Sequence, residues 1–212
     1  MRDTLSMNRV YSVLLAALFS AVVAQTTSGE DMNAPMEPKE SKLETATLAG
    51  GCFWCIEAVF EQTPGVKSVV SGYIGGIEPN PSYDQVCSGR TGHAEACQIT
   101  FDPSIISFKQ LLDVFWGAHD PTQLNRQGND IGTQYRSAVF YHSDEQKKTT
   151  EESIAALNAS GHYKDKVVTT LEPAGVFYAA EAYHQEYYRN NRAQPYCQYV
   201  IKPKLKKLGL AP

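Results

Sequence analysis

The chain has 212 residues, with 19 Lys plus Arg against 23 Asp plus Glu and a formal net charge of −4. This slightly acidic balance argues against nucleic acid or an anionic membrane surface as the main partner. Hydrophobic residues make up 42% of the sequence and aromatic residues 10%, which is enough for a substantial core. Composition therefore excludes disorder for most of the chain.

The first residues have the pattern of a secretory signal. Arg2 and Arg9 precede an apolar run from Val10 to Ala24, and a small residue at the end of this run suits cleavage after Ala24. The run is too short to span a bilayer comfortably, with an uncleaved anchor or a buried helix as the alternative. We expect a signal peptide over residues 1–24, export to a bacterial periplasm, and no stable membrane association after cleavage.

The segment that follows the apolar run is polar and contains Pro35 and Pro38. Such a composition cannot bury enough apolar surface to fold, so we expect a disordered linker over residues 25–42. The folded domain is then expected over residues 43–212.

The folded part begins with a weakly alternating strand over residues 44–49 that ends at a Gly-Gly turn. A helix is predicted over residues 52–61, followed by a strand over residues 66–71. A Gly-, Pro- and Ser-rich loop then carries a short helix around residues 83–86, and a clear strand follows over residues 93–101.

The second half continues with mixed helices and strands. In chain order, we predict a helix capped by Ser107 and ended by Gly117, a loop over residues 118–133, a strand over residues 135–142, a helix with a Ser143/Gln146 capping box reaching about Asn158, a strand over residues 167–171, a helix over residues 179–190, and a Lys-rich tail from Cys197 that is interrupted by Pro203. Mixed rather than strictly alternating elements indicate an α+β fold with helices layered on a sheet.

The cysteines follow the expected signal and linker segments. They are Cys52, Cys55, Cys87, Cys97 and Cys197. An odd count in an exported chain leaves at least one thiol unpaired, which a purely structural disulfide framework normally avoids. The cysteines therefore indicate a chemical role rather than a purely structural one.

The sharpest motif is the run GGCFWC at residues 50–55. A thiol in the first turn of a helix faces unpaired N–H groups and the positive end of the helix dipole, so we expect the pKa of Cys52 to lie below the free value of about 8.5. Cys55 lies one turn away. Phe53 and Trp54 are two large aromatic residues whose exposure would be costly unless they line a pocket.

Three interpretations of this motif are open: a dithiol–disulfide exchanger, half of a zinc site, and a nucleophile with a neighbouring thiol. No second CxxC and no HxxxH is present to complete a zinc shell, so we expect no metal. Two buried cysteines without a chemical role are the remaining alternative.

Glu95 lies in the strand predicted over residues 93–101, on the same face as Cys97, Ile99 and Phe101. A carboxyl group on an apolar face has a raised pKa and can donate a proton to an oxygen near neutral pH. In the alternative, Glu95 lies at the solvent-exposed end of the strand and has an ordinary pKa. Tyr83 and Tyr135, in or beside the polar loops, are candidates to hold such an oxygen.

From about Thr47 to Asn190, the sequence resembles the peptide methionine sulfoxide reductase A family. The motifs that carry the resemblance are GGCFWCIEAVF, VVSGYIGG, NPSYDQVCSGRTGHAEA, FDPS, FWGAHDPTQLNRQGNDIGTQYRS and AEAYHQEYY. The resemblance implies a two-layer α/β sandwich with a mixed sheet and a ferredoxin-like core. We further expect a monomer that needs no cofactor.

The resemblance implies roles for individual residues. Cys52 matches the nucleophile that attacks the sulfoxide sulfur of oxidised methionine, free or in proteins, and Glu95 matches the proton donor. The remaining matches are Tyr83 and Tyr135 for hydroxyls that bind the sulfoxide oxygen, Phe53 and Trp54 for the pocket around the methyl group, and Asp130 for a nearby acid acting through water. A sulfenic acid on the nucleophile then closes a disulfide, which a thioredoxin-type dithiol reduces.

The chain departs from the family in its recycling cysteines. It has both Cys55 and Cys197, whereas family members carry either a cysteine at the first position or cysteines at the C-terminus. We predict that Cys55 resolves the sulfenic acid on Cys52, with Cys197 or a relay through both as alternatives. Cys87 and Cys97 are expected to be structural.

Two other functions stay open at this level. One is a thiol–disulfide oxidoreductase that uses Cys52 and Cys55 but leaves Glu95 and the two tyrosines without a role. The other is a non-catalytic module that binds methionine-rich surfaces through Phe53 and Trp54.

Overall fold

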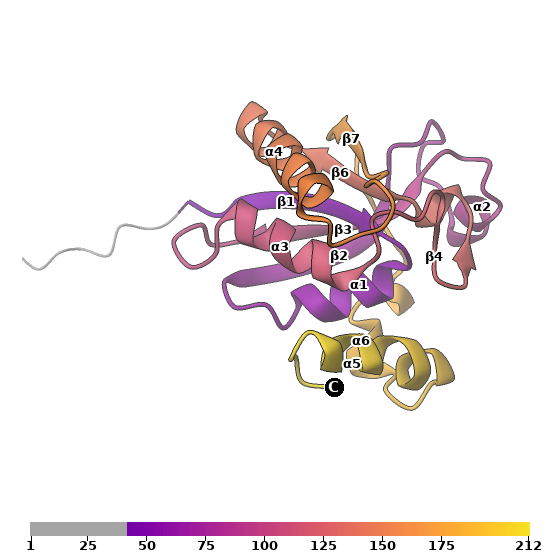
Figure 1. Ribbon diagram of the computed structural model, residues 1–212. Helices are drawn as coiled ribbons and strands as arrows, with labels where there is room; N and C mark the ends of the chain where they lie inside the picture. Colours follow the sequence, from indigo (N-terminus) through magenta and orange to yellow (C-terminus); the bar gives the residue numbers. More distant parts are fainter. Residues whose placement is uncertain (1–41) are drawn as a thin grey trace, which may run out of the picture. The chain divides into compact units, whose positions relative to one another are not determined.

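The computed structural model describes residues 42–212 (Figure 1), so the predicted signal peptide and nearly all of the predicted linker lie outside the described residues. The strands are β1 (Glu44–Gly50), β2 (Val66–Ile74), β3 (Ala94–Phe101), β4 (Arg126–Gln127), β5 (Asp130–Ile131), β6 (Ser137–Tyr141), β7 (Thr170–Pro173) and β8 (Tyr178–Ala179). The helices are α1 (Phe53–Phe60), α2 (Tyr83–Cys87), α3 (Phe108–Ala118), α4 (Asp144–Ser160), α5 (Tyr187–Asn190) and α6 (Lys202–Lys207). Within residues 42–212, no helix has the length and apolarity to cross a membrane.

A six-stranded mixed sheet in the order β7-β6-β1-β3-β2-β8 forms the centre of this part of the chain. Every neighbouring pair is antiparallel except β6 and β7, which are parallel. The strands β6-β1-β3-β2, with α1 between β1 and β2 and α3 between β3 and β6, have the βαββαβ connectivity of a ferredoxin-like core. The prediction of an α+β fold with a mixed sheet is confirmed.

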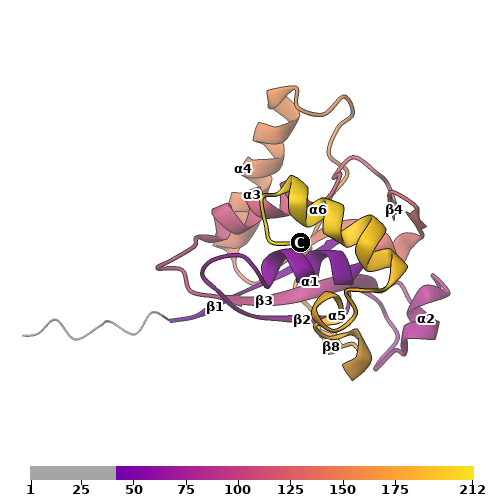
Figure 2. The ribbon, with the colours of Figure 1, turned by 90° about the horizontal axis from the view of Figure 1, so that it is seen from below.

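The helices α1 and α3 lie on the same face of this sheet (Figure 1), and the C-terminal helices α5 and α6 lie beside α1 (Figure 2). Cys97, Ile99 and Phe101 of β3 belong to the large core between sheet and helices, whereas Ala94 and Ala96 belong to a small cluster on the other face. The alternation predicted for this strand is therefore confirmed. It places Glu95 on the helix-covered face.

Capping residues mark several helix starts as the sequence predicts. The Ser107 hydroxyl accepts a hydrogen bond from the Gln110 N–H, and the Gln110 side chain accepts one from the Ser107 N–H. At α4, the Ser143 hydroxyl accepts from the Gln146 N–H, but the Gln146 side chain accepts from the His142 N–H instead of completing the reciprocal box. A cap is therefore present, with its second half shifted by one residue.

Three predicted boundaries are wrong. The helix expected to stop at Gly117 continues to Ala118, and it ends because His119 adopts an extended conformation with a φ of −147°. Tyr135 lies in a short 3-10 turn before β6 rather than inside the strand. The strand expected over residues 167–171 begins three residues later as β7, because its pairing with β6 starts at Thr170.

The helix predicted over residues 179–190 is also wrong. This segment contains β8, a 3-10 turn over Ala182–His184, and the single turn of α5. Glu186 has a φ of 50°, which interrupts any helix, and its N–H donates to Oε1 of the buried Glu57 at 2.9 Å. The Tyr187 N–H donates to Oε2 of the same carboxyl group at 2.9 Å. Long-range hydrogen bonds thus replace the local helical ones.

The sequence predicted that Pro203 interrupts the C-terminal segment, and this prediction is wrong. A π-helical turn over Cys197–Ile201 runs directly into α6, and Pro203 occupies the first turn of that helix. A proline is tolerated there because the first turn of a helix does not need its N–H, and because the wider π-helical turn before it leaves room for its ring.

Candidate active site

Two glycines bring the end of β1 close to the start of α1. Gly51 has a φ of +94°, and a Cβ at this position would lie 2.7 Å from the side chain of Gln127. A Cβ on Gly50 would lie 2.8 Å from the ring of Phe115. Because only glycine leaves room for both approaches, the turn delivers Cys52 to the N-cap position of α1.

The thiols of Cys52 and Cys55 are free, with the residues only 8% and 3% exposed. They line a groove of about 290 Å³, which we call the thiol groove and which Asp130 and Tyr196 also line. The Cys55 sulfur lies 3.7 Å from the Tyr196 hydroxyl, and that hydroxyl donates to Asp130 Oδ2 at 2.8 Å. The nucleophile candidate, a second thiol and an acid therefore meet at one opening.

The two thiols do not titrate alike. Burial raises the pKa of Cys52 well above its ordinary value, and the hydrogen bond with Cys55 and the charge of Glu95 raise it further. The hydrogen bond from Cys52 lowers the pKa of Cys55 to about 7. The expected low pKa at Cys52 is thus wrong for the substrate-free protein. Its side chain makes no capping hydrogen bond, so burial outweighs the helix terminus.

Glu95 is 1% exposed and lies against the first turn of α1. Its Oε2 accepts a hydrogen bond from the Phe53 N–H at 3.1 Å. Burial raises the pKa of Glu95 to about 8, and the charges of Asp130 and Cys55 raise it as well. The predicted raised pKa is confirmed, so this carboxyl group mostly keeps its proton at neutral pH.

Tyr83 and Tyr135 come from different elements near this acid. Tyr83 opens α2, and its N–H donates to Glu181 Oε1 at 2.9 Å. Burial raises the pKa of both phenols, and the charge of Glu95 contributes in each case. Both hydroxyls therefore keep their protons at neutral pH and lie within electrostatic range of Glu95, where they can donate hydrogen bonds.

Phe53 and Trp54 are held by other rings. The Trp54 indole stacks on Tyr187, with ring centroids 3.6 Å apart, and its Nε1–H donates to His184 Nδ1 at 3.2 Å. The Phe53 ring centroid lies 5.1 Å from that of His184. These two residues pack into the surrounding aromatic cluster rather than line the thiol groove, and their substrate-binding role stays a prediction.

Three residues that position this site were not predicted. Tyr196 connects the thiol pair to Asp130, Glu181 accepts from the backbone of Tyr83 and the hydroxyl of Tyr73, and His184 lies among the rings of Phe53, Trp54 and Tyr83. Two of them stand in the motif AEAYHQEYY, and Tyr196 directly precedes Cys197. Their sequence positions carried no signal of which partner each would meet.

The other cysteines are placed as follows. Cys197 is fully buried in the π-helical turn, and burial together with the charge of Cys55 raises its pKa. Cys97 is also fully buried, with its thiol 3.5 Å from the Phe53 carbonyl oxygen. Cys87 ends α2, and a hydrogen bond with Tyr83 lowers a pKa that burial raises above its ordinary value. Only Cys55 lines the thiol groove together with Cys52.

Known proteins match this chain over the part described above. The profile of the family described as "Peptide methionine sulfoxide reductase" matches residues 44–210. The peptide methionine sulfoxide reductase MsrA of Leptospira borgpetersenii is 58% identical over 165 residues, which cover 78% of this chain and 93% of that protein. The MsrA of Saccharolobus solfataricus is 55% identical over 165 residues, which cover 78% of this chain and 92% of that protein.

Solved structures give the same result. Methionine sulfoxide reductase A of Corynebacterium diphtheriae superposes with a TM-score of 0.65 at 39% identity, over 74% of this chain and 78% of that chain. Mxr1 from Saccharomyces cerevisiae in reduced form superposes with a TM-score of 0.68 at 36% identity, over 76% of this chain and 93% of that chain. With its motifs, its ferredoxin-like core and its thiol groove all in agreement, the chain belongs to the peptide methionine sulfoxide reductase family.

Proposed function

We propose that Cys52 and Glu95 carry out the thiol-dependent reduction of methionine S-sulfoxide, free or in polypeptides, that is the reaction of this family. The observation that carries the proposal is the contact of the buried, proton-holding Glu95 with the first turn of the helix that begins at Cys52. A sulfoxide needs a nucleophile at sulfur and a proton at oxygen, and this arrangement supplies both.

The first step is the ionisation of the thiol pair. The two thiols titrate as a pair, and their mutual hydrogen bond makes the first proton of the pair easier to lose than that of an isolated buried thiol. The hydrogen bond between the two sulfurs then lets Cys55 take the proton of Cys52 when substrate arrives. Cys55 thus acts as the base that generates the attacking thiolate.

The second step transfers the oxygen. The Cys52 thiolate forms a bond to the sulfoxide sulfur while Glu95 protonates the oxygen, which Tyr83 and Tyr135 hold by hydrogen bonds. The hydroxyl group then moves from the substrate sulfur to the Cys52 sulfur as the substrate S–O bond and the new sulfur–sulfur bond break. Methionine and a sulfenic acid on Cys52 result, so the sulfoxide is reduced by two electrons and the cysteine is oxidised by two.

The third step recycles the enzyme. The thiol of Cys55 attacks the sulfenic acid, a disulfide forms, and water leaves. An external dithiol of the thioredoxin type then reduces the disulfide by exchange. Cys55 is favoured over Cys197 because it shares the thiol groove with Cys52, whereas Cys197 is fully buried.

The reaction is tested by giving the purified protein the separate S and R epimers of a methionine sulfoxide peptide, with dithiothreitol and a Cys52→Ser control. Reduction of the S epimer alone, abolished in the control, is expected. Turnover of neither epimer with disulfide exchange intact would favour a thiol–disulfide oxidoreductase. Tight binding of unoxidised methionine peptides without turnover would favour a binding module.

The recycling cysteine is tested by mapping disulfides by mass spectrometry after one turnover without reductant. A bridge between Cys52 and Cys55 is expected in the wild type and in Cys197→Ala. In Cys55→Ala, the sulfenic acid should form more slowly because the base is lost, but it should then persist and be trapped by dimedone. A dominant bridge between Cys52 and Cys197 in the wild type would contradict the assignment.

Export is proposed from the sequence of residues 1–24, with the bacterial periplasm as destination and an exported thioredoxin-like protein as reductant. Fractionation of a Gram-negative host that expresses the full chain should place the protein in the periplasm, with a mass that shows cleavage after Ala24. We propose that the mature protein is a monomer, which light scattering coupled to size-exclusion chromatography tests directly.

A further inference from the structure

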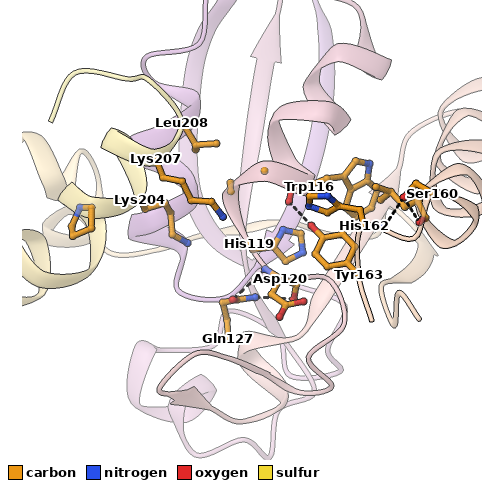
Figure 3. Close-up of a pocket in the computed structure, with 14 residues that line it drawn as sticks. Trp116, His119, Asp120, Gln127, Ser160, His162, Tyr163, Lys204, Lys207 and Leu208 are labelled. Atoms are coloured by element: carbon orange, nitrogen blue, oxygen red, sulfur yellow. Dashed lines mark hydrogen bonds between the residues drawn. The ribbon is translucent and has the colours of Figure 1, made fainter. Parts of the chain in front are cut away.

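A second and larger groove, of about 940 Å³, lies next to the thiol groove. Figure 3 shows its walls: Lys204, Lys207 and Leu208 on the side of α6, and Trp116, Ser160, His162 and Tyr163 on the side of α3 and α4. We call it the α6 groove. Gln127 and Lys204 line both grooves, so the α6 groove continues the depression that holds the thiols.

The walls of the α6 groove combine apolar side chains, among them Trp116, Leu157 and Leu208, with polar ones, and several of the polar atoms already have partners. The Trp116 Nε1–H donates to Ser153 at 2.8 Å, and the Tyr163 hydroxyl donates to the Trp116 carbonyl oxygen at 3.1 Å. His119 lies within hydrogen-bonding distance of Phe115 O and Ser137 Oγ, and burial lowers its pKa to about 4. The side chains of Trp116, Tyr163 and His119 are therefore uncharged at neutral pH.

Two lysines and one aspartate line the groove, so its charge balance is positive. Lys204 and Lys207 extend from α6 toward the middle of the groove (Figure 3), and within residues 42–212 neither forms an ion pair. The one carboxylate in the lining, Asp120, accepts hydrogen bonds from Thr122 and Gln123. The positive charge of the α6 groove is therefore local, because the chain as a whole carries a net charge of −4.

We propose that the α6 groove binds the polypeptide segment next to the oxidised methionine and selects segments with carboxylates a few residues away from it. This inference rests on the proposed function and extends it to the substrate class. The apolar parts of the walls suit apolar side chains of an extended segment, while the ammonium groups of Lys204 and Lys207 pair with its carboxylates. Free methionine sulfoxide reaches only the thiol groove and does not use the α6 groove.

The inference is tested with two ten-residue peptides that each contain one methionine S-sulfoxide, flanked by Glu in one and by Gln in the other. Dithiothreitol serves as reductant, and free methionine sulfoxide is the reference substrate. The wild type is expected to prefer the Glu peptide about five- to tenfold in kcat/KM, mainly through KM, at low ionic strength. The preference should shrink toward one in 0.5 M salt.

The decisive variant is Lys207→Gln, because Lys207 lines the α6 groove but not the thiol groove. It is expected to lose most of the preference for the Glu peptide and to reduce free methionine sulfoxide like the wild type. Lys206→Gln is the matched control, since this neighbouring exposed lysine on α6 lines neither groove. Lys207→Glu should reverse the preference toward a peptide flanked by Lys.

Several results would overturn the inference. Equal preference in the wild type and Lys207→Gln would do so, as would an equal loss in Lys206→Gln, which would indicate a general charge effect. A change confined to turnover driven by a protein dithiol would assign the groove to the reductant. Fluorescence anisotropy of labelled peptides with Cys52→Ser tests the groove without turnover, so a failure of the reaction itself is distinguished from a failure of this proposal.

Discussion

Glu95 accepts a hydrogen bond from the backbone N–H of Phe53 at 3.1 Å, although the two residues are separated by 42 positions in the sequence. The bond joins the strand that carries the acid to the helix turn that carries the nucleophile. It also satisfies a donor at the helix N-terminus that would otherwise be unpaired. The same contact therefore stabilises the start of α1 and holds the proton donor beside Cys52.

The rate of methionine release in a single turnover is expected to pass through a maximum between about pH 7 and pH 8. The rising limb reflects the first ionisation of the thiol pair, where the pKa of Cys55 is about 7. The falling limb reflects Glu95, whose pKa is about 8 and which must be protonated to act. Quench-flow measurements from pH 5 to pH 10 check this, and a rate that keeps rising above pH 9 would argue against Glu95 as the donor.

Glu95→Gln is expected to trade activity for stability. The pKa of Glu95 is raised from 4.5 to about 8, so the free energy of unfolding of the wild type falls as pH rises through this range. Gln still accepts from the Phe53 N–H but carries no charge, and the variant should be more stable by about 4 kcal/mol at pH 7.5 and by little at pH 4. Single-turnover methionine release should fall by about 10²- to 10⁴-fold.

Urea unfolding at the two pH values measures the stability difference in Glu95→Gln. A variant that is less stable than the wild type at pH 7.5 would mean that Glu95 is stabilised in its charged form. That result would remove the basis for treating it as a proton donor.

Tyr196→Phe is expected to slow methionine release at neutral pH, because its hydroxyl favours the ionisation of the thiol pair. The hydroxyl lies 3.7 Å from the Cys55 sulfur, and its hydrogen bond contributes to the lowered pKa of that thiol. Without it, the pH midpoint for alkylation of Cys55 by iodoacetamide should move upward. Tyr199→Phe is the matched control, because Tyr199 lines the same groove and is 82% exposed. An equal shift in both variants would rule out this role for Tyr196.

Glu57→Ala is expected to release the C-terminal segment from α1. The Glu57 carboxyl group accepts from the N–H groups of Glu186 and Tyr187, which would both lose their partner, at a cost of about 3 kcal/mol or more. Because Trp54 stacks on Tyr187, release of the segment should expose Trp54 to water and shift the fluorescence of Trp54 to longer wavelength.

Glu61→Ala serves as control for Glu57→Ala. Glu61 pairs with the half-exposed Arg189 at 3.5 Å, and its loss should cost less than about 1 kcal/mol. Unfolding experiments compare the two variants. Similar costs in both would mean that the hydrogen bonds to Glu57 do not hold the segment.

Local patterns in the sequence were sufficient for much of the fold. The alternation of β3 predicted the buried face on which Glu95 lies, and the capping residue Ser107 predicted the start of α3. The motifs around Cys52 indicated the family. These features depend on residues within a few positions of one another, so periodicity and capping chemistry reveal them.

Other features were decided only by tertiary structure. The bonds from Glu186 and Tyr187 to Glu57 span 129 and 130 positions and replace a predicted helix, and the bond from Tyr196 to Asp130 spans 66. The raised pKa of Cys52 follows from burial by segments that are distant in sequence. The sequence by itself determined which chemical groups are present and which strand or helix carries each. Only packing decided their neighbours and their desolvation, because both depend on contacts between remote segments.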